Sequence, residues 1–134
     1  MSKDLENFFN RQFDEHNKVA SDCKKKLQSS FLNVTKICVS SLKSKKKILF
    51  FGNGGSASDA QHLATELTVR FSKNRKAIPA ISLATDTSAI TAIGNDFGFG
   101  FIFSRQIEAI GNTGDVAIGI STSGKSENVI NGLK

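Results

Sequence analysis

The hydrophobic pattern divides the chain into a helical N-terminal segment and an alternating segment that begins near residue 45. In the first segment apolar residues recur at spacings of three or four, which predicts two helices, or one long helix bent near Ser21. These apolar positions are Leu5, Phe8, Phe9, Phe13, Val19, Cys23, Leu27, Phe31, Val34, Cys38 and Leu42. The first helix carries three phenylalanines and is too apolar for a solvent-facing helix, so we expect it to pack on another subunit or on its own domain.

The rest of the chain alternates short apolar runs with helical patterns. Three runs predict strands, at 47–51, 80–84 and 115–120. Four patterns predict helices, at 57–70, 87–93, 101–110 and from 126 onward. Strands that alternate with helices form a parallel sheet with helices on both faces. We therefore expect an α/β fold, an αβα sandwich preceded by N-terminal helices over 1–45, with residues 1–134 forming one domain.

A hydroxyl-rich turn, Ser121-Thr-Ser-Gly-Lys-Ser126, follows the third predicted strand. Ligands of parallel sheets bind at the carboxyl ends of the strands, where this turn lies. Its four hydroxyls, its glycine and the free N–H groups of the next helix suit a phosphate monoester. The alternative is an ordinary capped helix start, but four hydroxyls in six residues exceed what a cap needs.

A glycine-rich turn, Gly52-Asn-Gly-Gly-Ser56, follows the first predicted strand and is also suited to an anion. Gly52, Gly54 and Ala57 match the dinucleotide fingerprint G-x-G-x-x-G/A. That fingerprint requires an acidic residue about 20 residues further on, and Asp86 comes too late. Dinucleotide binding is therefore a minor alternative.

The helix predicted over 57–70 separates apolar from polar side chains. The apolar face that should cover the sheet contains Ala60, Leu63, Ala64 and Leu67, and the flank contains Asp59, His62, Glu66 and Arg70. His62 and Glu66 are i,i+4 neighbours, which can share a zinc ion or exchange protons with one substrate, although two ligands do not complete a tetrahedral site. A surface polar pair is the ordinary alternative. A carboxylate near a bound sugar phosphate could instead remove a proton next to a carbonyl.

Composition narrows the partners and the compartment. The net charge of +6 comes largely from lysine runs at 24–26 and 43–47 and favours small anionic substrates. The chain has no Tyr or Trp and no arginine interleaved with aromatic residues, so we expect no nucleic acid. No apolar run approaches the roughly 18 residues of a membrane span, and no signal peptide is seen, so we expect a cytoplasmic protein without membrane contact. Cys23 and Cys38 should be reduced core thiols.

Six separate motifs resemble those of the sugar isomerase (SIS) domain of bacterial phosphoheptose isomerases. They lie at 52–56, 59–62, 66–70, 92–99, 103–105 and 119–124. The resemblance runs from about Leu42 to the end of the chain. It implies an αβα sandwich, a homotetramer with active sites at subunit interfaces, and conversion of sedoheptulose 7-phosphate to D-glycero-D-manno-heptose 7-phosphate, the first step of ADP-heptose synthesis for lipopolysaccharide core.

The resemblance also implies roles for individual residues. The phosphate would be held by Ser121, Thr122, Ser123 and Ser126, with Ser56 assisting. The sugar would be contacted by Asn53, Gly54, Gly55, Asn95 and Asp96. His62 and Glu66 match metal ligands, usually zinc, and Glu66 also matches the base of an enediol mechanism. These two roles for Glu66 stay open, because a carboxylate bound to a cation is a poorer base.

The chain departs from the resembled family at its C-terminus. Members run roughly 60 residues longer, and their last helix carries an Arg-Ile-Gln-Glu-x-His motif that completes the metal site and supplies the general acid. That motif is absent from these 134 residues. We therefore expect a C-terminal part to be missing, and residues 1–134 alone to neither isomerise the heptose nor bind zinc well. The alternative is a non-catalytic SIS protein that binds a sugar phosphate or DnaA, but Glu66 beside His62 favours an enzyme.

Overall fold

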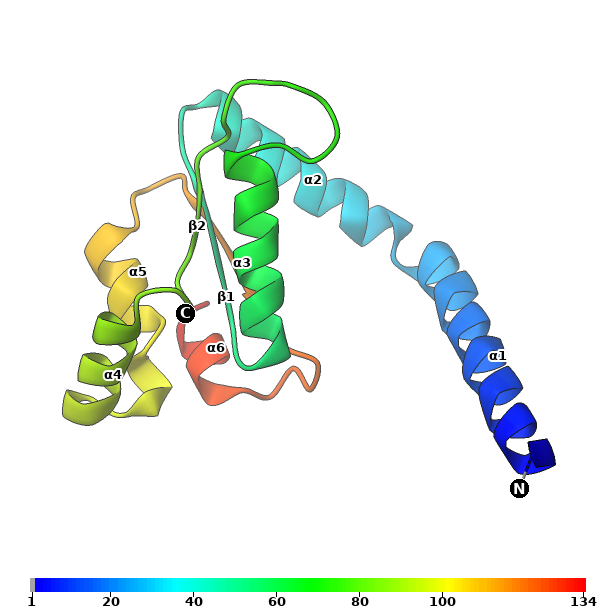
Figure 1. Cartoon of the computed structure of the whole chain (residues 1–134). Coiled ribbons are helices and arrows are strands. Elements are labelled where there is room, and N and C mark those ends of the chain that lie inside the picture. Colours follow the sequence, from blue (N-terminus) through cyan, green and yellow to red (C-terminus); the bar gives the residue numbers. More distant parts are fainter. Residues whose placement is uncertain (1) are drawn as a thin grey trace. The chain divides into compact units, whose positions relative to one another are not determined.

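The computed structural model describes residues 2–134, which fall into two compact units (Figure 1). The first unit ends at Ile37 and the second runs from Cys38 to Lys134. The N-terminal segment forms two helices, α1 (Ser2–Lys26) and α2 (Gln28–Lys43). The two-helix interpretation is confirmed, but the bend lies at Leu27 and not near Ser21. Hydrogen bonds continue through the bend, since Leu27 N–H donates to the Cys23 carbonyl and the Leu27 carbonyl accepts from Phe31 N–H, both at 2.9 Å.

The second unit contains a parallel sheet of three strands in the order β2-β1-β3. The strands are β1 (Ile48–Gly52), β2 (Ala80–Ser82) and β3 (Val116–Ile120). The other elements are α3 (Gly55–Thr68), α4 (Thr87–Asp96), the 3₁₀ helix η1 (Phe99–Phe101), α5 (Ser104–Ile110) and α6 (Glu127–Asn131). The central strand pairs with both neighbours, Ile48 opposite Ala80 on one side and Val116 on the other. The predicted parallel α/β architecture is therefore confirmed.

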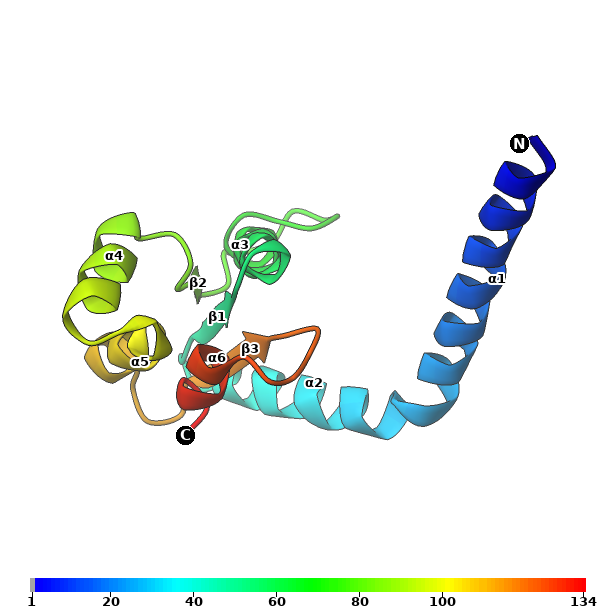
Figure 2. The ribbon, with the colours of Figure 1, turned by 90° about the horizontal axis from the view of Figure 1, so that it is seen from below.

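Helices cover both faces of this sheet, and each face has its own apolar core (Figure 2). Leu49 and Phe51 point to the face covered by α4, α5 and α6, where they pack with Leu83, Ile102, Phe103 and Val129. Ile48 and Phe50 point to the opposite face, where they pack with Ala60 and Ala64 of α3 and with Cys38 and Leu42 of α2. The alternation follows from the two-residue period of a strand, and both sets are apolar because a central parallel strand is buried on both sides.

Two predictions about burial need correction. Leu63 was expected on the sheet-facing side of α3, but it is 42% exposed, and the close contact is made by Ala60 and Ala64. Small residues allow the helix axis to approach the sheet, which leaves Leu63 at the margin. The prediction of two core thiols is wrong for Cys23, which is exposed on α1, whereas Cys38 is half-buried and burial raises the pKa of its thiol.

Three phenylalanines lie exposed on α1. Phe8, Phe9 and Phe13 are 53%, 60% and 55% exposed, and the rings of Phe9 and Phe13 lie 4.7 Å apart. Packing on another subunit and packing on the chain's own domain both stay predictions. None of the helices within residues 2–134 is both long and apolar enough to cross a membrane.

A buried carboxylate ties the start of β1 to the start of β3. Asp115, whose side chain is 7% exposed, accepts hydrogen bonds from the backbone N–H of Lys47 at 2.9 Å and of Asn112 at 2.8 Å, and pairs with the Lys47 ammonium group. Burial by itself raises the pKa of Asp115, but these hydrogen bonds and the Lys47 charge together lower it to about 2.

We predict that Asp115→Asn destabilises the protein at neutral pH by about 1 to 3 kcal/mol, because one charge-assisted acceptor is replaced by an amide. The folded state holds the Asp115 pKa below its ordinary 3.8, so the stabilisation is present above about pH 4 and is lost as pH falls toward 2. Urea unfolding at several pH values measures both effects. Asp14→Asn, on the exposed surface of α1, is the control. An Asp115→Asn variant with parental acid sensitivity would contradict this role.

Candidate functional site

The turn between β1 and α3 brings backbone close to a neighbouring strand. A Cβ atom on Gly52 would lie 2.7 Å from both the Ile120 carbonyl oxygen and the Cβ of Ser56, so only glycine fits there. Gly54 has φ 55° and ψ −121°, a conformation that side-chain-bearing residues rarely adopt. Gly55 opens α3, and no side chain caps that helix start. Within the first turn of α3, the N–H groups of Ser56 and Ala57 donate to the carbonyl oxygens of Asn53 and Gly54, both at 3.0 Å, so these two amides are already engaged.

The hydroxyls of the second turn, residues 121–126, lie close to one another. The Ser121 hydroxyl is 3.1 Å from that of Ser126 and 3.4 Å from that of Ser123. Ser121 and Ser123 also accept from the backbone N–H groups of Gly124 and Lys125, which shapes the turn. Ser126 precedes α6 but makes no side-chain cap bond, so the alternative of a simple capped helix start is not supported. Thr122 is exposed.

The two turns lie side by side at the carboxyl ends of β1 and β3. Gly52 and Ile120 are register partners in the sheet, so each strand ends next to the other. Beyond them, Asn53 and Asn128 exchange two hydrogen bonds of 2.8 Å, each amide N–H donating to the other amide oxygen. Asn128 was missed at the sequence level, because no local pattern pairs residues that are 75 positions apart. The one local indication in the sequence is that Asn128, a polar amide, stands next to apolar Val129 at the start of a predicted helix.

The predicted pair on α3 is formed. His62 Nε2 lies 3.5 Å from Glu66 Oε1, with the His62 side chain 72% exposed and that of Glu66 27% exposed. The second carboxylate oxygen, Glu66 Oε2, is buried and has no hydrogen-bond partner within residues 2–134. Burying a carboxylate oxygen without a hydrogen-bond donor costs free energy, so such atoms in folded proteins call for an explanation. A ligand that donates a hydrogen bond to Oε2, or a cation bound there, would offset this cost.

Helix geometry separates Glu66 from the glycine turn of the same chain. Ten residues at 1.5 Å each place Glu66 about 15 Å along the axis from Ser56. The end of α3 is held by Arg75, whose guanidinium donates to the carbonyl oxygens of Glu66 and Leu67. Arg70, predicted on the same flank, lies beyond the end of the helix at Thr68. The short separation that the sequence interpretation assumed is therefore not met within one copy.

Asn95 and Asp96 are the last two residues of α4. They are exposed and hydrogen-bond to each other at 2.7 Å. Helix α4 covers the face of the sheet opposite α3 (Figure 2). Within residues 2–134, no hydrogen bond or ion pair joins this pair to either turn. Their contact with a sugar stays a prediction.

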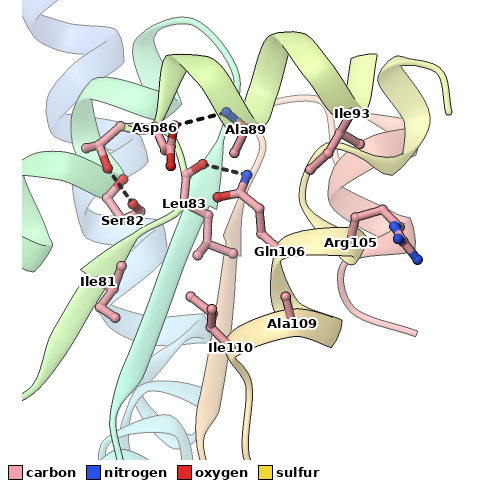
Figure 3. Close-up of a pocket in the computed structure, with 11 residues that line it drawn as sticks. Ile81, Ser82, Leu83, Asp86, Ala89, Ile93, Arg105, Gln106, Ala109 and Ile110 are labelled. Carbon is pink, nitrogen blue, oxygen red and sulfur yellow. Dashed lines mark hydrogen bonds between the residues drawn. The ribbon is translucent and has the colours of Figure 1, made fainter. Parts of the chain in front are cut away.

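A cavity of about 330 Å³ lies beyond β2, between α4 and α5 (Figure 3). Its polar groups are already engaged within the chain. Gln106 donates to the Leu83 carbonyl, Asp86 accepts from Ala89 N–H, and Arg105 pairs with Glu108 while lying over the ring of Phe97. None of the predicted site residues lines it.

Two ligands from this chain do not complete a metal site. Among the residues that the structure describes, no group of three or more His, Cys, Asp or Glu side chains is placed to hold a metal ion. The orphan Glu66 Oε2 and the nearby His62 imidazole have the chemistry of zinc ligands, but a tetrahedral site needs four.

Comparison with known proteins places these features in a family. The SIS domain profile matches residues 12–134. The phosphoheptose isomerase of Campylobacter jejuni serotype O:6 is 52% identical over 128 residues, which cover 96% of this chain and 68% of that protein. The phosphoheptose isomerase of Nitratiruptor is 52% identical over 120 residues, which cover 90% of this chain and 64% of that protein. The phosphoheptose isomerase of Aquifex aeolicus is 61% identical over 103 residues, which cover 77% of this chain and 54% of that protein.

Solved structures agree with the curated relatives. The phosphoheptose isomerase GmhA of Neisseria gonorrhoeae has a TM-score of 0.88 at 43% identity and covers 96% of this chain and 67% of its own. The phosphoheptose isomerase of Francisella tularensis has a TM-score of 0.90 at 35% identity, with 95% and 66% covered. The chain thus spans 64% and 66% of the first two curated relatives that it matches. By its profile match, its sequence identity and its adjoining glycine and hydroxyl turns, the chain belongs to the SIS domain family and, within it, to the phosphoheptose isomerases.

Proposed function

We propose that this chain provides the sugar-phosphate site and the catalytic base of an aldose–ketose isomerase that converts sedoheptulose 7-phosphate to D-glycero-D-manno-heptose 7-phosphate. The proposal rests on membership of the phosphoheptose isomerases. The observation that carries it is the buried, unpaired Oε2 of Glu66, a carboxylate oxygen poised for a proton or a ligand. The product would feed ADP-heptose and lipopolysaccharide core synthesis in the cytoplasm.

The turn at 121–126 would hold the phosphate. Ser121, Ser123 and Ser126 group three hydroxyls within hydrogen-bond range of one another, and Thr122 adds a fourth from the exposed side of the turn. Hydroxyls donate to phosphate oxygens, and hydrogen bonds to a charged acceptor are about twice as strong as neutral ones. The glycine turn, with Gly54, Gly55 and the hydroxyl of Ser56, would lie on the sugar side.

Glu66 would act as the base. Its carboxylate would take a proton from C1 of the ketose while the carbonyl oxygen at C2 is protonated, which forms an enediol with a double bond between C1 and C2. Return of a proton to C2 and loss of the proton on O1 then give the aldehyde at C1. The number of protons is unchanged by this sequence, as an isomerisation requires.

Each active site would combine two copies of the chain. Glu66 lies about 15 Å along α3 from the glycine turn of its own copy, a separation longer than the seven-carbon chain of the open-chain ketose on which the reaction acts. A base from a neighbouring copy would solve this problem, and the exposed phenylalanines of α1 supply an apolar surface for assembly. A homotetramer with active sites at subunit interfaces is the arrangement we propose. Asn95 and Asp96, which make no hydrogen bond to either turn within residues 2–134, would contact the sugar across the same interface.

The family's zinc would take His62 and Glu66 as two of its ligands, and it would polarise the substrate carbonyl when bound. These two residues do not complete a tetrahedral site. The proposed proton transfers therefore do not involve the metal. Glu66 is proposed as the base because its Oε2 atom has no hydrogen-bond partner within residues 2–134.

We predict that Ser126→Ala weakens binding of sedoheptulose 7-phosphate and of inorganic phosphate about tenfold or more, because a hydroxyl donor to a charged ligand is lost. The turn should keep its shape, since Ser126 makes no cap bond with the backbone. Isothermal calorimetry measures both affinities. Ser104→Ala, which removes a hydroxyl bonded to the Phe101 carbonyl, should leave them unchanged. Parental affinity in Ser126→Ala would remove this residue from the phosphate site.

We predict that Glu66→Gln lowers turnover at least about 100-fold, because an amide cannot accept the proton from C1. Conversion of sedoheptulose 7-phosphate is followed by NMR with the protein as it is expressed from its gene, and phosphate affinity should be unchanged. Glu108→Gln, which removes an exposed carboxylate on α5, is the matched control. Near-parental turnover by Glu66→Gln would place the base elsewhere, with Asp96 as the next candidate. A parent without turnover would argue against the proposed reaction itself.

We predict that Phe9→Asp combined with Phe13→Asp dissociates the oligomer, because two charges would enter an apolar interface. Light scattering reports the mass, and turnover should fall with it if each site needs two copies. Asn7→Asp combined with Lys18→Gln makes the same change of two units in net charge on the opposite side of α1 and should leave the mass unchanged. An unchanged mass in the phenylalanine variant would exclude this surface from the interface.

A further inference from the structure

Asn128 is a buried polar residue without a role in the reaction described above. It is the second residue of α6 and is 3% exposed, so a bound ligand cannot reach it without displacing protein. Its amide makes two hydrogen bonds of 2.8 Å, both to the amide of Asn53. Burying an amide is costly unless it is fully paired, so this reciprocal arrangement explains how Asn128 is tolerated in the interior.

The pair leaves half of the Asn53 amide available. A carboxamide has two N–H donors and an oxygen with two lone pairs, and the pairing uses one donor and one lone pair of Asn53. Asn53 is half-buried and sits at the end of β1, next to the hydroxyl turn at the end of β3. Neighbouring strands lie about 4.8 Å apart, so a phosphate on that turn places the adjoining sugar near Asn53.

We propose that Asn128 is a positioning residue that fixes the Asn53 amide, so that its free donor and acceptor meet hydroxyls of a sugar whose phosphate is held at 121–126. This inference rests on the proposed function and assigns the recognition of the sugar to a buried residue. A hydroxyl both donates and accepts, and an amide that cannot rotate presents a defined donor and a defined acceptor to it.

The phosphate turn does not depend on this pair for its own shape. Its internal bonds run from the Gly124 and Lys125 N–H groups to the Ser121 and Ser123 hydroxyls. Losing the Asn128 amide therefore frees Asn53 to rotate but leaves the phosphate contacts in place. The affinity for the sugar part should fall more than the affinity for phosphate.

The test compares two ligands in each variant by isothermal calorimetry, namely sedoheptulose 7-phosphate and inorganic phosphate. In Asn128→Ala we expect sugar-phosphate affinity to fall about tenfold and inorganic phosphate affinity to change less than about threefold. Asn131→Ala is the matched control, because it removes the same amide from the same helix, where it donates to the Gly100 carbonyl at 3.1 Å and touches neither turn. This control should lower both affinities equally or not at all.

Asn128→Asp provides a second variant of nearly the same shape in case the alanine variant does not fold. Its carboxylate accepts from the Asn53 N–H but cannot donate to the Asn53 oxygen, so the ratio of the two affinities should again fall. Repulsion between the new charge and phosphate acts on both ligands and cancels in the ratio.

The positioning role would be overturned by an unchanged affinity ratio in both Asn128 variants, or by a fall of this ratio in Asn131→Ala as large as that in Asn128→Ala. Either result would leave the proposed function intact. A parent that binds the sugar phosphate no more tightly than inorganic phosphate would also overturn it. A parent that binds neither ligand would remove the proposed function and this inference together. A lower ratio of sugar-phosphate affinity to phosphate affinity in the Asn128 variants alone would support the positioning role.

Discussion

The structure depends on the double burial of β1. This strand pairs with β2 and β3 and carries apolar side chains to both faces of the sheet, where Phe51 joins one core and Phe50 the other. Removing such a strand from water on both faces is the largest hydrophobic contribution available to a small α/β unit. The other strands and the covering helices of the second unit pack around it, and the end of β1 sets the position of the glycine turn.

The ends of β1 and β3 are held by different polar interactions. At the amino ends, Asp115 bridges the strands through Lys47 and has its pKa lowered to about 2 by the hydrogen bonds it accepts. At the carboxyl ends, the uncharged Asn53–Asn128 pair joins the segment that follows β1 to the segment that follows β3. A neutral bridge suits the end where we propose that a phosphate binds, because a carboxylate there would repel it. The glycine at position 52 allows the close approach that this arrangement needs.

Two features of the chain remain unsatisfied within a single copy. The phenylalanines of α1 are exposed, and one carboxylate oxygen of Glu66 is buried without a partner. Exposed phenylalanine rings forgo the free energy of hydrophobic burial, and an unpaired buried oxygen carries a desolvation cost. Assembly of several copies around a shared ligand would remove both costs. The distance of about 15 Å along α3 from Glu66 to the glycine turn of the same copy agrees with the proposed site built from more than one copy.

The sequence alone determined what depends on local order: the strand and helix periods, the parallel sheet, the glycine-rich and hydroxyl-rich turns and the i,i+4 pairing of His62 with Glu66. Hydrophobic periodicity and turn chemistry are properties of neighbouring residues, so they can be read without coordinates. Only the tertiary structure decided that Cys23 and Leu63 are exposed and that Asn128 hydrogen-bonds to Asn53. These outcomes depend on which surfaces meet across the fold, and contacts between residues 75 positions apart leave no periodic trace in a single sequence.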